Sequence, residues 1–122
     1  MSDLEMLNYV KLAAFSAGKG QLLGRDRFLV LAGAAACHAG LLDIAATCRE
    51  LVLQDNPQHL LGRFPTFPDA LRGEDFCTLW KHLQRLCPPE QAEYLLNAAE
   101  ISDTVIDDDE TPAAAARRLL TA

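Results

Sequence analysis

Apolar residues recur three or four positions apart along most of the chain, which is the spacing of one face of an α-helix. The pattern is clearest in residues 74–87, where an apolar stripe lies opposite a charged side. That stripe consists of Phe76, Leu79, Trp80, Leu83, Leu86 and Cys87. Residues 28–37 carry no polar side chain, which predicts a central helix buried on most sides. Because no strand-type alternation of useful length occurs, the chain is predicted to be all-α.

Glycines, prolines and short polar residues divide this pattern into helices. Ser2 and Glu5 form a capping box, which predicts that a first helix begins at residue 2, and Gly18 is expected to end it. Asp26 is a favoured N-cap residue and predicts the start of the central helix, which Gly40 is expected to stop. Further helices are expected in residues 41–54, 74–87, 89–99 and 113–120. We therefore expect five to six helices in antiparallel hairpins, as a compact bundle or a short helical-repeat-like array.

The length of 122 residues is enough for one domain with one core, without a disulfide or a metal. We expect this domain in residues 1–106. The acidic run in residues 107–110 is typical of a solvated connector, and Thr111 followed by Pro112 predicts the start of a last short helix. Residues 107–122 are therefore expected to be a connector and a short C-terminal helix beyond the main domain.

The order of small and turn-forming residues within residues 26–59 resembles one unit of the tetratricopeptide family. The matching positions are Leu29, Gly33, Gly40, Leu42, Ala45 and Pro57. Units of this family are 34-residue helix pairs that stack and bind peptides, so the resemblance implies a helical hairpin and a protein-binding role. It covers about a quarter of the chain and does not recur in residues 60–93. An unrelated helical hairpin, which also needs small residues and a turn glycine, is the alternative.

Charge and hydropathy narrow the range of partners. There are 17 acidic and 11 basic side chains, a net charge of −6, whereas binding to nucleic acid requires a concentrated positive face. The amino end is acidic where a secretory signal would be basic, and the longest apolar run is too short to cross a bilayer. We therefore expect a cytoplasmic protein that binds neither nucleic acid nor membrane.

The segment 62–73 holds two phenylalanines and two prolines and predicts an ordered loop folded over the core. If both Phe64 and Phe67 pack inward, the loop is a lid on the core. If either ring is exposed, it marks a surface for a partner. The candidate partner surface is Phe64 and Phe67 together with the basic residues Arg63 and Arg72.

One group of residues has the chemistry of a catalytic site. Asp75 and His82 are two helical turns apart and share a flank with Cys77, so a small enzyme or a ligand-binding bundle that uses these three is the alternative function. The sequence predicts no cofactor and no metal site. Cys48 and Cys87 lie on apolar faces and are expected to be inert thiols.

The sequence therefore favours a non-catalytic interaction or adaptor module made of helical hairpins, whose partner is another protein or peptide. A regulatory helical homodimer is a third alternative.

Overall fold

The computed structural model describes residues 3–99 and 110–121 of the chain. These residues form seven α-helices and one short 3-10 helix, with no strand among them. The elements are α1 (Asp3–Gly18), α2 (Leu22–His38), α3 (Leu42–Asp55), η1 (Leu60–Arg63), α4 (Phe67–Arg72), α5 (Glu74–Leu86), α6 (Pro89–Ala98) and α7 (Pro112–Thr121). The all-α prediction is confirmed for the part of the chain that the structure describes. No helix there is long and apolar enough to cross a membrane.

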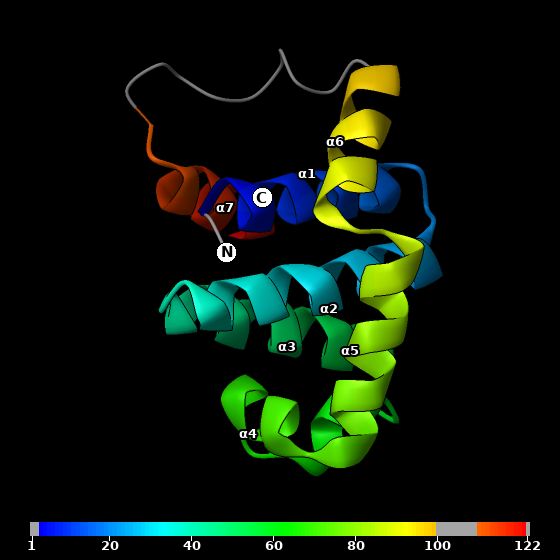
Figure 1. Ribbon diagram of the computed structural model, residues 1–122, viewed down its shortest axis with the longest axis vertical. Coiled ribbons are helices and arrows are strands. Elements are labelled where there is room, and N and C mark those ends of the chain that lie inside the picture. Colours follow the sequence, from blue (N-terminus) through cyan, green and yellow to red (C-terminus); the bar gives the residue numbers. More distant parts are fainter. Residues whose placement is uncertain (1–2, 100–109, 122) are drawn as a thin grey trace.

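The helices form layers, with a column along one side. Figure 1 shows α1 and α7 in the upper layer, α2 and α3 in the middle and α4 at the bottom, while α5 and α6 follow one another along one edge. Helix α2 packs against α1, α3, α4 and α5, and α1 also packs against α6 and α7. Two of the turns contain a glycine in left-handed backbone, Gly20 with φ 73° and Gly40 with φ 79°, so the predicted stop at Gly40 is confirmed.

The predicted central helix is the centre of the core. All eight residues from 29 to 36 are buried, and five of them are alanine or glycine. Such small side chains let neighbouring helices approach closely. At Gly33 the aromatic ring of Phe67, from the start of α4, lies against the α2 backbone.

The beginning of α2 differs from the prediction. The helix starts at Leu22, so Asp26 lies one turn inside it rather than at its N-cap, and its side chain is buried. Asp26 is instead bonded to its neighbour, because Arg25 Nη2 donates to Asp26 Oδ1 over 3.2 Å. Arg25 Nη2 also donates to the Leu51 carbonyl of α3 at 3.2 Å, so the surroundings of Asp26 depend on a tertiary contact that a single sequence does not show.

Helix α7 packs onto α1 and α3. Ala115 and Ala116 are fully buried, so the C-terminal helix contributes to the same core as the rest of the described chain. Its predicted start is confirmed, since Thr111 Oγ1 accepts a hydrogen bond from the amide of Ala114 at 3.1 Å. The expected connector 107–109 and the expected cap Ser2 lie outside the described residues.

Candidate functional site

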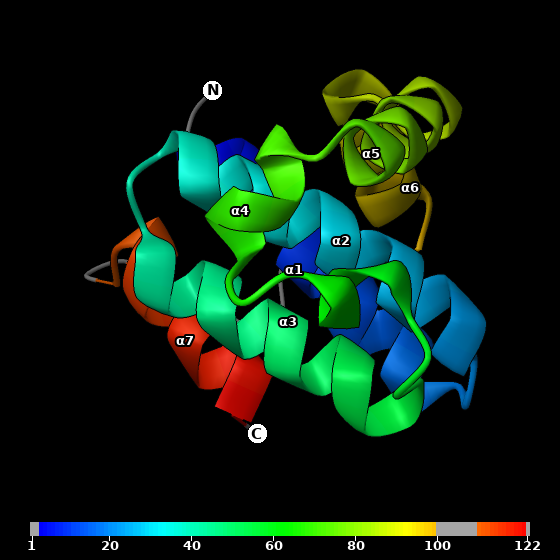
Figure 2. The ribbon, with the colours of Figure 1, turned by 90° about the horizontal axis from the view of Figure 1, so that it is seen from below.

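A groove of about 410 Å³ lies between α3 and the segment that leads into α4. We call it the α3 groove. It is lined by Leu42, Ala46, Arg49 and Glu50 on one side and by Pro65, Thr66, Phe67 and Pro68 on the other. Figure 2 shows the chain that connects α3 to α4 running between these two helices.

The helical wall of the groove follows from the period of α3. Residues 46, 49 and 50 follow residue 42 by four, seven and eight positions, so all four share one face of the helix. The buried face of α3 is a different one and includes Ile44 and Cys48. Leu42 is 56% exposed, which leaves a large apolar side chain in solvent at one end of the groove. Arg49 and Glu50 lie at the other end.

The opposite wall is held rigidly. Thr66 caps α4, because its Oγ1 accepts from the amide of Asp69 at 3.3 Å and donates to Asp69 Oδ2 at 2.8 Å. Phe67 is 1% exposed, and its ring meets that of Phe76 edge to face with centroids 5.6 Å apart. Arg49 Nη2 donates to the carbonyl of Phe64 at 2.9 Å and so ties this wall to α3. The groove is therefore formed in advance of any ligand.

The guanidinium of Arg49 has fewer hydrogen-bond acceptors than a half-buried group of this kind usually has. Its side chain is half-buried, and the bond to Phe64 is the only hydrogen bond of its guanidinium among the described residues. The Nε–H group is buried with no acceptor in that part of the chain. A buried donor without an acceptor costs free energy, about 1–3 kcal/mol, so such atoms are uncommon in folded proteins.

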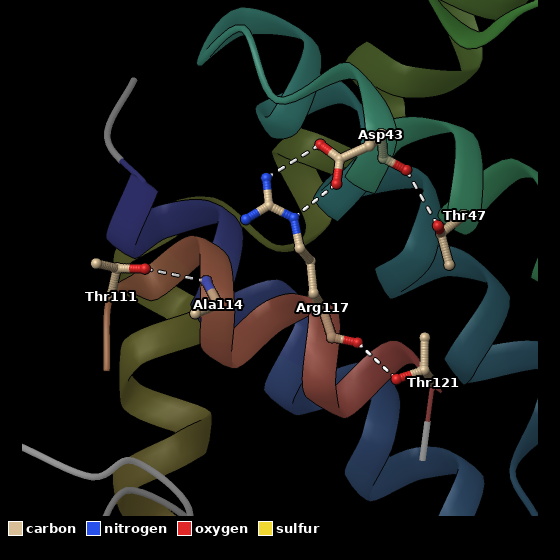
Figure 3. Close-up of polar contacts among 6 residues, drawn as sticks. All are labelled: Asp43, Thr47, Thr111, Ala114, Arg117 and Thr121. Atoms are coloured by element: carbon tan, nitrogen blue, oxygen red, sulfur yellow. Dashed lines mark hydrogen bonds and ion pairs between the residues drawn. The ribbon is translucent and has the colours of Figure 1, made fainter. Parts of the chain in front are cut away.

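The acidic residues nearest to Arg49 along the helix do not neutralise it. Glu50 is exposed and forms no ion pair with Arg49 in the described structure. Asp43, near the start of α3, is engaged by Arg117 of α7 over 2.6 Å and 3.2 Å (Figure 3). The hydrogen bond from Arg117 lowers the pKa of the Asp43 carboxyl below 3.8. Arg49 is thus a half-buried cation without a carboxylate partner.

The predicted partner surface is only partly exposed. Phe67 is buried in the wall of the groove opposite α3, and Phe64 is half-buried with its ring against Gly73. Both rings pack inward, which is the lid arrangement. Arg63 and Arg72 are exposed, and Arg72 pairs with Asp69 at 3.4 Å. The α3 wall was not predicted from the sequence, although the mixed apolar and charged residues 42, 46, 49 and 50 share one helical face.

The three residues of the alternative catalytic site lie on α5. Asp75 and His82 are exposed and Cys77 is half-buried. No hydrogen bond or ion pair joins any two of them among the described residues, and none of them lines the α3 groove. The described residues contain no group of three or more His, Cys, Asp or Glu side chains placed to hold a metal ion.

The thiols that were expected to be inert are enclosed. Cys48 is fully buried and Cys87 is 9% exposed. Burial raises the pKa of the Cys48 thiol to about 12 and also raises the pKa of Cys87. All four cysteines are free. A raised pKa keeps a thiol protonated at neutral pH and therefore unreactive.

A second groove, of about 250 Å³, lies between α2, α5 and α6. Its lining is mainly apolar and consists of Gly24, Arg27, Phe28, Leu31, Leu83, Leu86, Cys87, Gln91 and Leu95. It shares no residue with the α3 groove, so changes made in one groove serve as controls for the other.

No protein-family model matches this chain, and no curated protein or solved structure is significantly similar to it. The resemblance of residues 26–59 to a tetratricopeptide unit therefore stays a prediction.

Proposed function

We propose that this chain is a non-catalytic protein-binding module and that the α3 groove receives a segment of its partner. The observation that carries the proposal is the groove itself, which joins an exposed apolar end at Leu42 to an incompletely bonded cation at Arg49. Binding sites in proteins commonly combine an apolar lining with a few polar groups that fix orientation. The rigid wall at Thr66 and Phe67 reduces the ordering that binding would require.

A peptide is the class of partner that suits this groove. The face of α3 from residue 42 to residue 50 is about 12 Å long at a rise of 1.5 Å per residue. An extended peptide of about four residues covers that length. The groove opens to solvent, as Leu42, Ala46 and Glu50 are all exposed, so a longer chain can enter and leave it.

The proposal is tested by selecting a phage-displayed random peptide library on the purified full chain. Ala46→Trp places a large ring in the α3 groove, and Gln91→Trp does the same in the second groove. Both positions are exposed on helices, so neither change should prevent folding. Selected peptides are expected to bind the wild type and Gln91→Trp equally. Their binding to Ala46→Trp should be weaker by about tenfold or more, which corresponds to about 1.4 kcal/mol.

Failure to select any peptide would contradict this function. So would a set of peptides whose affinity is the same for Ala46→Trp as for the wild type. Circular dichroism of both variants establishes that each keeps its helical content, so that a loss of binding reports on the groove.

A further inference from the structure

We infer that the partner segment places a carboxylate side chain on Arg49 and an apolar side chain against Leu42 and Ala46. This inference rests on the proposed function and specifies the chemistry of its partner. It starts from the pairing of arginines in the described residues. Arg25, Arg72, Arg117 and Arg118 each form an ion pair with a carboxylate. Arg49 forms none.

Arg49 differs from the other arginines that lack an ion pair. Arg27, Arg63 and Arg85 are exposed, so water solvates their charge, whereas Arg49 is half-buried and has an enclosed Nε–H. A guanidinium has five N–H donors, and only one of those on Arg49 has an acceptor in the described structure. A carboxylate can accept two guanidinium N–H groups at once, here from Nη1 and Nη2, because the enclosed Nε–H is out of reach of a ligand. The groove on which Arg49 lies therefore suits an anionic group.

Glu50 is the group that could reverse this preference. It lies beside Arg49 on the groove and would repel a carboxylate. However, Glu50 is exposed, so solvent and salt screen its charge more strongly than that of the half-buried Arg49. The enclosed cation therefore determines the sign of the partner group, and Glu50 only reduces the affinity.

The spacing between the two partner side chains follows from α3. Leu42 and Arg49 are seven residues apart, or about 10.5 Å along the helix axis. In a peptide with polyproline II backbone this distance corresponds to about three residues at 3.1 Å each, and residues three apart share one face because this helix has three residues per turn. A partner sequence of the form Leu-x-x-Glu matches both ends of the groove.

The test uses three phage libraries in which random peptides contain a fixed Leu-x-x-Glu, Leu-x-x-Gln or Leu-x-x-Lys. Each is selected on the purified full chain. We expect recovery of the Glu library to exceed that of the Gln and Lys libraries by about tenfold. The excess should disappear on Arg49→Gln, persist in part on Arg49→Lys, and increase on Glu50→Gln. The shorter side chain of Arg49→Gln also loses the bond to the Phe64 carbonyl, so thermal unfolding checks that the variant folds.

Equal recovery of the Glu and Gln libraries, or an excess of the Lys library, would overturn the inference. An excess of the Glu library that survives in Arg49→Gln would also overturn it, because the carboxylate would then bind elsewhere. The proposed function is judged separately. If the unbiased library yields peptides that Ala46→Trp no longer binds, the groove is a docking site even where the three fixed libraries show no preference. If both selections fail, the proposed function and the inference about the carboxylate are both wrong.

Discussion

The ring of Phe67 lies where a side chain on Gly33 would have to be. A Cβ built on Gly33 would overlap Cε2 of Phe67 and would be 2.6 Å from its Cζ. Two helices far apart in the sequence, α2 and α4, meet at this point, and Phe67 also lines the wall of the α3 groove opposite α3. The missing side chain on Gly33 thus sets the position of one wall of the groove.

We expect Gly33→Ala to lower the free energy of unfolding by about 1–3 kcal/mol, because an added methyl group overpacks this contact. Urea unfolding followed by circular dichroism measures the change. Gly24→Ala is the control in the same helix, since a Cβ there meets only Ser16 Oγ at 3.8 Å. That change should stabilise the protein by up to about 1 kcal/mol, because alanine is the better helix former. Equal losses from the two substitutions would contradict the role assigned to Phe67.

Sequence patterns were sufficient for the parts of this fold that local chemistry determines. The apolar run 28–37 became the buried centre of α2, Gly40 adopts the expected left-handed backbone, and Thr111 caps the last helix. These features follow from the apolar spacing and backbone preferences of a few neighbouring residues. The position of Asp26 inside α2 depends instead on partners from distant parts of the chain, and was wrong in the prediction.

The candidate site could be predicted only in part, for the same reason. Segment 62–73 was predicted to be an ordered loop over the core, but its residues 67–72 form helix α4. Which of its rings face inward depends on Gly33 and Phe76. In the sequence, nothing distinguishes Arg49 from an ordinary arginine on a helix surface. Its lack of a partner becomes visible only when the Phe64 carbonyl is placed beside it.

A buried hydrogen bond connects the first helix to the end of α5. The Tyr9 hydroxyl donates to the carbonyl of Cys87 at 2.9 Å, and the Tyr9 side chain is 3% exposed. We expect Tyr9→Phe to lower the free energy of unfolding by about 1–2 kcal/mol, because the Cys87 carbonyl would lose its buried donor. Tyr94→Phe is the matched control, since Tyr94 is 64% exposed, and should leave the stability unchanged. Denaturant midpoints of the two variants measured side by side test this expectation.

Packing of alanines, more than ion pairing, is expected to hold α7 in place. Ala116 is fully buried, whereas both members of the Arg117–Asp43 pair are about half exposed (Figure 3). We expect Ala116→Leu to cost about 1–3 kcal/mol of stability through overpacking. Arg117→Gln should have a much smaller effect that vanishes in high salt, because exposed ion pairs are weak and screened.

Hydrogen exchange of the amides in residues 112–121 distinguishes these two contributions. Protection should fall strongly in Ala116→Leu and change little in Arg117→Gln. If Arg117→Gln released α7 as completely as Ala116→Leu does, the ion pair would be the main contact of this helix.

The buried carboxyl of Asp26 makes stability depend on pH in an unusual direction. Burial and a hydrogen bond with Asp55 raise the pKa of Asp26 from 3.8 to about 6, against the opposing effect of Arg25. The folded protein therefore binds this proton more tightly than the unfolded chain does. A raised carboxyl pKa contributes stability that is fully present below about pH 3.8 and is lost as the pH rises to about 6.

Other groups titrate in the same range, and a matched variant separates their effects. Burial lowers the pKa of His59 below 6.5, which makes stability rise with pH, opposite to the effect of Asp26. Asp26→Asn removes the carboxyl and leaves His59 in place. The variant should gain stability relative to the wild type between pH 4 and pH 6.5, by at most about 3 kcal/mol. Urea unfolding of both proteins at half-unit pH steps gives this difference directly. A difference that stays constant across the range would mean that the pKa of Asp26 is the same in the folded and unfolded protein, which contradicts the raised pKa.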